Sequence, residues 1–112
     1  MRRGAIWWAN LPEPWGRRPV LLLSRDEAYR YLNAVVVAPL TTRVRGIASE
    51  VPLDPEHDGV PKPCAANFDN LQQIRKELLD SPIAMLSPAK IAAADRALHF
   101  ALNITNCPSR SV

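Results

Sequence analysis

Two arginines stand directly before an apolar run in the segment RRPVLLLSRD, residues 17–26. An arginine guanidinium stays charged at physiological pH, and its planar fork matches the oxygens of a phosphate group. Arg18 begins the run at residues 18–24, whose continuously apolar centre predicts a strand that is buried on both faces. A fixed charge at the start of such a strand is either a solvated strand edge or one half of a phosphate site.

A second position with suitable chemistry is Thr41, which follows the run AVVVAPL at residues 34–40. β-Branched residues dominate that run and predict a strand. Arg18 and Thr41 would then both lie at the rim of a sheet, and a curled sheet offers a groove at its rim. An antiparallel meander does not by itself bring the two residues together.

Further arginines lie in the turns beside these strands, and a tryptophan accompanies them. Trp15 lies in a proline-rich loop just before Arg17. An aromatic ring and arginines in one loop are typical of base stacking and phosphate binding, which indicates a nucleic-acid site. The alternative, and the commoner case, is a solvated charged rim around an ordinary core. The turn residues concerned are Arg17, Arg25, Arg43 and Arg45.

The composition predicts one small domain over residues 1–112, with a core of ordinary size because 47% of the residues are hydrophobic. Eleven prolines against four glycines favour several short strands over a helical bundle. The net charge of +3 permits an anionic partner without requiring one. Neither a signal peptide nor an apolar run long enough to cross a bilayer is recognisable, so we expect a cytoplasmic protein with no membrane contact.

The metal-binding residue types are few and scattered. Cys64 and Cys107 are expected to be free thiols in a strand and in the tail, and the two histidines do not lie at ligand spacing from them. We therefore expect no metal and no cofactor. His57 is interpreted as a solvated loop residue, and His99 as a surface or core-edge residue on the closing helix.

The remaining pattern predicts a mainly β, α+β chain: a small, curled antiparallel sheet or barrel closed by one helix. Ser87-Pro88 is a good helix start, and apolar residues then repeat at helical spacing to about residues 102–105. Residues 71–81 are ambiguous between a strand with a turn and a short helix, and residues 103–112 are expected to form a flexible tail. The expected strands are residues 4–10, 18–24, 34–40, 48–53, 64–68 and 83–86, with one or two helical turns at 26–32 and an exposed loop at 54–63.

The order of these segments resembles the MazF/PemK family of toxin endoribonucleases over about residues 2–102. The matching motifs are RRGAIWWANL, RRPVLLLSRD, AVVVAPLTT, SEVPL, NFDNLQQI and the helix LSPAKIAAADRALHFAL, in that order. The resemblance implies an SH3-like curled barrel with short helices and a C-terminal helix. It also implies the toxin of a type II toxin–antitoxin system, which arrests translation and growth.

The chemistry implied by the resemblance is sequence-selective, metal-independent cleavage of single-stranded RNA. The 2′-hydroxyl attacks the adjacent phosphorus and leaves 2′,3′-cyclic phosphate and 5′-hydroxyl ends. The family's catalytic arginine precedes Pro-Val, which here is Arg18, and its catalytic threonine closes the VVxPLT strand, which here is Thr41. A guanidinium and a hydroxyl donor suit the charge that gathers on the non-bridging oxygens in the transition state. No residue is assigned as the general base.

RNA contacts outside the catalytic pair are implied as well. The family covers RNA with the loop before the RPV strand, and an acidic–amide pair, here Asp69 and Asn70, reads base edges. The alternatives are that Trp15 packs against its own loop and that the acidic–amide pair caps a turn. The expected RNA-binding residues are Trp15, Arg17, Ser24, Arg25, Arg43, Asp69 and Asn70.

Two positions depart from the family pattern, and both bear on base preference and dimer contacts. Ala5 stands where many relatives carry an acidic residue, and Leu71-Gln72 stands where many have Ile-Arg. The implied partners are a second copy of the chain, RNA in the groove between the copies, and a cognate antitoxin whose acidic and apolar segment folds onto that groove. The RNA is messenger RNA, with transfer and ribosomal RNA as other candidates.

Three other functions stay open on the sequence. A CcdB-like toxin shares the fold and poisons DNA gyrase by binding, although such a protein needs neither Arg18 nor Thr41. An SH3-like module would bind RNA without cutting it. A relative that kept the fold and lost its activity is the third.

Overall fold

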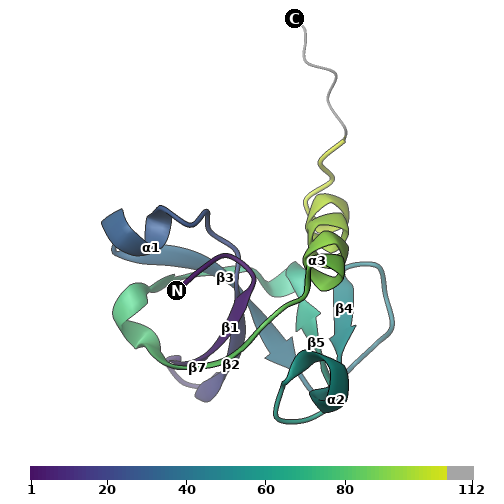
Figure 1. Ribbon diagram of the computed structural model, residues 1–112, viewed down its shortest axis with the longest axis horizontal. Coiled ribbons are helices and arrows are strands. Elements are labelled where there is room, and N and C mark those ends of the chain that lie inside the picture. Colours follow the sequence, from purple (N-terminus) through teal and green to yellow (C-terminus); the bar gives the residue numbers. More distant parts are fainter. Residues whose placement is uncertain (106–112) are drawn as a thin grey trace, which may run out of the picture.

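The computed structural model describes residues 1–105 and shows a curled, entirely antiparallel sheet with helices at its ends (Figure 1). The sheet runs in the order β4-β5-β3-β2-β1-β7, and β6 pairs with β3 outside this path. The predicted mainly β fold with a closing helix is therefore observed. The strands are β1 Ala5–Asn10, β2 Arg17–Leu22, β3 Ala34–Thr41, β4 Glu50–Leu53, β5 Cys64–Asn67, β6 Gln72–Arg75 and β7 Leu79–Met85. The helices are α1 Ala28–Tyr31, α2 Pro55–Asp58 and α3 Pro88–Ala101, with 3₁₀ turns η1 Phe68–Asn70 and η2 Lys76–Leu78.

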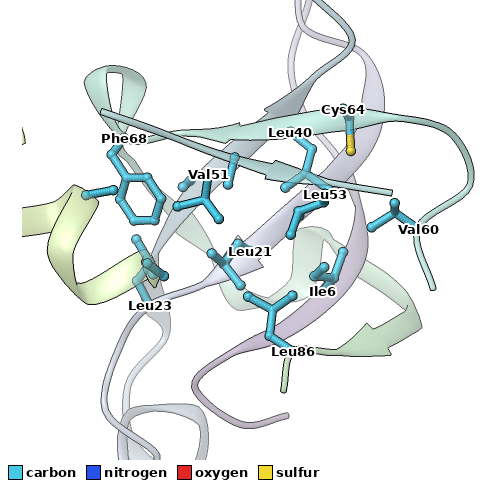
Figure 2. Close-up of a cluster of buried hydrophobic side chains, with 14 residues drawn as sticks. Ile6, Leu21, Leu23, Leu40, Val51, Leu53, Val60, Cys64, Phe68 and Leu86 are labelled. Atoms are coloured by element: carbon cyan, nitrogen blue, oxygen red, sulfur yellow. The ribbon is translucent and has the colours of Figure 1, made fainter. Parts of the chain in front are cut away.

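Strand β2 is buried on both faces, as its continuous apolar run predicts. Leu21 packs on one side, in the larger core cluster with Ile6 and Leu40 (Figure 2). Val20 and Leu22 pack on the other side, in a second cluster. Because successive side chains of a strand point to opposite faces, this one run joins both halves of the core. The second half of β2 is thus held from both sides, whereas the strand starts with the exposed Arg17.

Helix α3 covers the larger core cluster beside β4 and β5 (Figure 1). It begins as predicted: Ser87 is the N-cap, its Oγ accepts a hydrogen bond from Lys90 N at 3.2 Å, and Pro88 occupies the first helical position. Ala94 and Ala97 bring the helix close to the core. The helix ends at Ala101, slightly before the predicted end at residues 102–105, and its C-cap Leu102 is exposed.

The prediction of one long exposed loop at residues 54–63 is wrong in part. The segment contains α2, whose N-cap Asp54 accepts a hydrogen bond from His57 N at 2.8 Å. Asp58 and Val60 are buried. The Asp58 carboxylate accepts hydrogen bonds from Asp54 N and Lys90 Nζ at 2.9 and 3.2 Å, while Val60 enters the larger core cluster. These contacts shape the segment into an ordered connection between β4 and β5.

The ambiguous residues 71–81 form β6, η2 and the first part of β7. The last strand therefore begins at Leu79. The predicted start of this strand at Ile83 is wrong. Pairing with β1 over its whole length, with two register shifts, defines this strand. Pro82 is accommodated because β7 lies at the edge of the sheet.

The other predicted strands agree with the observed ones to within one or two residues. The first of the predicted helical turns at residues 26–32 is seen as α1. No helix in residues 1–105 is long and apolar enough to cross a membrane. Cys107 and the end of the predicted flexible tail lie outside the described residues, and the single domain over residues 1–112 stays a prediction.

Candidate active site

The rim between β2 and β3 carries a cavity of about 370 Å³ to which both Arg18 and Thr41 contribute. Strands β2 and β3 are antiparallel neighbours, with Val20 opposite Pro39. Continuing this register by two residues places Arg18 opposite Thr41. The cavity is lined by Trp8, Arg17, Arg18, Pro19, Leu40, Thr41, Thr42, Pro61, Lys62 and Cys64.

The pairing between β2 and β3 ends just before the two candidate residues. The last paired residues of this ladder stand two positions away from Arg18 and Thr41. On its other edge β3 pairs with β6 and then with β5, where Leu40 and Thr41 lie opposite Ala66 and Ala65. The cavity lies at this end of the ladder and is also lined by the segment that leads into β5.

Arg18 is half-buried and keeps its charge available. Its Nε donates to the Trp15 carbonyl oxygen at 3.3 Å, and its guanidinium lies 5.3 Å from the centre of the Trp15 ring. No carboxylate of residues 1–105 forms an ion pair with it. The contacts orient the guanidinium without neutralising it, which suits an anion-binding role.

The Thr41 hydroxyl accepts one hydrogen bond within the chain and can donate another. Its Oγ1 accepts a hydrogen bond from Arg43 N at 3.1 Å. One lone pair of the oxygen is thereby occupied, and the hydroxyl hydrogen stays available as a donor. A phosphate oxygen in the cavity can accept that hydrogen. Arg43 itself is exposed in the adjoining loop.

Arg17 lines the same cavity in a different electrostatic state. Its Nη2 and Nε donate to Asp80 Oδ2 at 2.7 and 3.2 Å. Its guanidinium also lies over the Trp8 ring, 4.4 Å from the ring centre. Asp80 offsets the positive charge of Arg17, so Arg18 contributes more to the potential of the cavity than its neighbour does.

The other predicted RNA-binding residues lie apart from this cavity. Ser24 follows the opposite end of β2, where its Oγ accepts a hydrogen bond from Val36 N at 2.8 Å, and Arg25 is exposed beside it. Trp15 is 37% exposed, and the Arg18 guanidinium lies over its ring, so part of the ring is open to solvent. Its role in RNA binding stays a prediction.

Asp69 and Asn70 form part of η1, beyond the end of β5 that is remote from the cavity. The Asp69 carboxylate accepts a hydrogen bond from Ser49 Oγ at 2.6 Å and lies 4.0 Å from Arg45 Nη2. The turn itself is capped by Asn67, whose Oδ1 accepts from Asp69 N at 2.9 Å. Both predicted residues are exposed, and their role in RNA binding stays a prediction.

Sequence reasoning named Arg17, Arg18 and Thr41 as site residues but not the other lining residues, which include Trp8, Thr42, Lys62 and Cys64. Trp8 comes from β1, while Lys62 and Cys64 come from the segment before β5 and from its first position. Burial, helped by the charge of Asp58, raises the pKa of the Cys64 thiol to about 11. The thiol is therefore protonated at neutral pH and is a poor nucleophile.

The two histidines are exposed and do not line the cavity. His57 is thus the solvated residue that was predicted, although in α2 and not in a loop, and His99 is a surface residue. His57 Nδ1 lies 3.0 Å from Asp54 Oδ1 in the cap of α2. Among residues 1–105, no three His, Cys, Asp or Glu side chains are close enough to hold a metal ion. The polar side chains that line the cavity include two arginines, two threonines and a lysine, a set suited to phosphate.

Fold and site together define a small protein with a curled antiparallel sheet and, at the rim of the sheet, a cavity whose side chains suit a phosphate. Comparison with known proteins gives the family. The model of the PemK-like, MazF-like toxins of type II toxin–antitoxin systems matches residues 2–102. The chain belongs to this family, and the resemblance found in the sequence is confirmed.

Individual relatives agree over almost the whole chain. The chain is 40% identical to the probable endoribonuclease MazF5 of Mycobacterium tuberculosis, with 90% of this chain and 92% of the relative covered. The solved structure of the M. tuberculosis toxin MazF-mt6 is 36% identical, with a TM-score of 0.82 and coverage of 90% and 98%. A mycobacterial endoribonuclease solved in complex with its cognate antitoxin is 27% identical, with a TM-score of 0.81 and coverage of 94% and 97%. These structures confirm the predicted fold class.

Proposed function

We propose that this chain is a sequence-selective endoribonuclease toxin that cleaves single-stranded RNA without a metal, with Arg18 and Thr41 as its catalytic pair. The enzyme class follows from the family and from relatives that are named endoribonucleases. The observation that supports the assignment of the pair is their convergence on one cavity, in which Arg18 has no carboxylate partner among residues 1–105.

The proposed reaction is an internal transesterification. The RNA 2′-hydroxyl gives up its proton to water as its oxygen bonds to the adjacent phosphorus, the bond from phosphorus to the 5′-oxygen breaks, and the leaving 5′-oxygen takes up a proton from water. Negative charge grows on the non-bridging oxygens as the fifth bond forms. The Arg18 guanidinium and the Thr41 hydroxyl, whose hydrogen is available, stabilise that charge. Two fixed donors provide the electrostatic stabilisation that a metal provides in other nucleases.

RNA reaches the pair through stacking and charge. The exposed Trp15 ring lies directly beside Arg18, so a base stacked on it would bring its own phosphate to the guanidinium. Arg43 lies two residues after Thr41 and extends the basic rim. The remaining expected contacts, Ser24 with Arg25 and Asp69 with Asn70, would bind nucleotides farther from the cut or RNA held by a second copy of the chain.

The partners proposed with this activity are a second copy of the chain and a cognate antitoxin. One structural neighbour is an endoribonuclease solved with its cognate antitoxin. An acidic antitoxin segment would compete with RNA for the same cations, which explains inhibition by simple occupancy. Cleavage of cytoplasmic RNA would arrest translation and growth until the antitoxin returns.

The test is cleavage of a long single-stranded RNA by purified protein in EDTA, followed by mapping of the ends. We expect cuts at a recurring short motif with 2′,3′-cyclic phosphate and 5′-hydroxyl ends. Arg18→Ala and Thr41→Ala should each lower the rate by about 100- to 1,000-fold, as for loss of one transition-state donor. Arg96→Ala is the matched control, because Arg96 is exposed on α3 and outside the cavity.

The outcomes separate the alternatives. Cleavage at the parental rate by Arg18→Ala would refute the site. Absence of cleavage together with inhibition of DNA gyrase would indicate a CcdB-like toxin. RNA binding without cleavage would indicate a non-catalytic module, and loss of both would indicate a relative without activity.

A further inference from the structure

We infer that Lys62 binds the RNA phosphate at the cleavage position beside Arg18, as a further cationic group of the active site. This inference rests on the proposed function, since it concerns the same cavity. Lys62 lines that cavity together with Arg18 and Thr41, although it lies 21 residues after Thr41 in the sequence (62 − 41). The pairing of β3 with β5 brings its segment to the rim.

The backbone around Lys62 is held firmly. Val60 is buried two residues before it, and Cys64 is buried two residues after it. Pro61 has a fixed φ angle, and Pro63 restricts the backbone of Lys62 to extended conformations. The lysine therefore stands on a short, stiff bridge between two anchors in the core. This mounting fixes the backbone of Lys62 at the cavity wall, and its exposed, flexible side chain can bring the ammonium group to an anion in the cavity.

The other lysines of the chain are engaged elsewhere. Lys90 Nζ donates to the Pro52 carbonyl oxygen at 2.8 Å and lies 3.2 Å from Asp58 Oδ2. Lys76 Nζ donates to the Tyr29 carbonyl oxygen at 2.9 Å. Lys62 makes no ion pair or side-chain hydrogen bond with any of residues 1–105. A stiffly mounted cation without a protein partner, facing a cavity, is suited to an anionic ligand.

The charge balance of the cavity indicates which anion. Asp80 offsets Arg17, so Arg18 and Lys62 are the cations that line the cavity without a carboxylate partner among the described residues. A phosphodiester carries one negative charge, and its non-bridging oxygens gain more as the 2′-oxygen attacks. An ammonium group binds phosphate as a point charge and complements the directional fork of an arginine.

The test compares Lys62→Gln, Lys62→Arg and the charge control Arg96→Ala in single-turnover cleavage of RNA with a mapped cut site. We expect Lys62→Gln to cut about 100-fold more slowly, as for other lost transition-state donors, and Lys62→Arg to recover most of the rate. Binding is measured with the same RNA carrying one 2′-deoxy nucleotide at the cut. Loss of one phosphate contact should lower the slope of log affinity against log salt by about 0.7 for a single strand.

Each outcome decides between the two proposals. If the parental chain cuts RNA and Lys62→Gln matches Arg96→Ala in rate and salt slope, the inference is wrong and the proposed function stands. If the parental chain does not cut, binding to a single-stranded RNA decides: a lower salt slope for Lys62→Gln alone keeps Lys62 as a phosphate ligand, and unchanged slopes overturn it. Unfolding midpoints of the three variants, expected to agree, exclude misfolding as the cause.

Discussion

The loop after Thr41 is closed by one buried carboxylate, and its removal gives a sharp test of how the site is supported. The Glu50 side chain is 1% exposed. Its Oε1 accepts hydrogen bonds from Arg45 N at 2.8 Å and Gly46 N at 3.2 Å, while Oε2 accepts from Arg45 Nε at 3.2 Å. Oε1 therefore binds the backbone of the loop, and Oε2 binds the Arg45 side chain.

Two substitutions of Glu50 separate these duties. Glu50→Gln can keep a carbonyl oxygen at the Oε1 position, but its amide nitrogen then faces the Arg45 Nε donor, so one bond is lost. Glu50→Ala loses all three. At about 1 kcal/mol for each net hydrogen bond, the expected losses in the free energy of unfolding are about 1 and about 3 kcal/mol. Arg45 is 52% exposed, which keeps the first value small.

Thermal and urea unfolding, followed by circular dichroism, measure these losses. For a domain of this size, about 1 kcal/mol corresponds to about 4 °C, so the midpoints should fall by about 4 °C and about 12 °C. Arg45→Ala should resemble Glu50→Gln, and combining the two should add little because they remove the same contact. Glu56→Ala, at an exposed glutamate, is the control and should change little.

The result that contradicts this reasoning is equal destabilisation by Glu50→Gln and Glu50→Ala, which would mean that the buried charge, and not the hydrogen bonds to the backbone, accounts for the stabilisation.

The cleavage rate supplies a second test of the role of Glu50. The loop begins with the Arg43 amide that orients the Thr41 hydroxyl. Glu50→Ala should therefore lower the cleavage rate at a temperature where the variant is still folded, and Glu50→Gln should leave it close to the parental value.

Three further predictions concern the fold and the charges at the rim. Gly4→Ala should lower the free energy of unfolding, measured by urea titration, by about 3 kcal/mol, because Gly4 has a φ of +92° and a Cβ there would lie 2.9 Å from a side-chain carbon. Gly46 has a φ of +67° but open space around it, so Gly46→Ala should lower the same free energy by only about 1 kcal/mol. Folding raises the pKa of the Cys64 thiol from 9.0 to about 11, so between pH 9 and 11 the folded chain holds a proton that the unfolded chain has lost. The free energy of unfolding should therefore fall as the pH rises from 9 to 11, and it should fall less in Cys64→Ala. Asp80→Asn should change stability by less than about 1 kcal/mol, since its pair with Arg17 is exposed, and should tighten RNA binding in a filter assay by releasing that cation.

Local sequence signals predicted the elements whose structure is decided locally. The β-branched run gave β3, the continuous apolar run gave the doubly buried β2, and Ser87-Pro88 gave the start of α3. Helix α2 was missed although Asp54-Pro55 is a start signal of the same kind as Ser87-Pro88, because its four residues are too few to show an apolar repeat at helical spacing. The early start of β7 was missed because pairing with β1, which is remote in sequence, defines it.

The candidate site shows the same difference between local signals, which the sequence reveals, and long-range pairing, which it does not. Arg18 and Thr41 could be named from motifs, but their meeting depends on the register between β2 and β3, which no local pattern specifies. Lys62 could not be found, because a lysine between two prolines reads as an exposed loop until the pairing of β3 with β5 is known. The pairing of Arg17 with Asp80 across 63 residues was equally hidden.

The positive character of the cavity depends on placement more than on composition. The whole chain carries a net charge of only +3, so its overall field is weak and is screened within about 10 Å at ordinary salt. Strands β2 and β5 pair with opposite edges of β3, and Arg18 and Lys62 come from β2 and from the segment before β5. Both cations line one cavity and attract a phosphate bound in it, whereas a distant surface arginine is screened from that phosphate. Moving a charge within the rim should therefore change cleavage far more than adding one elsewhere on the surface.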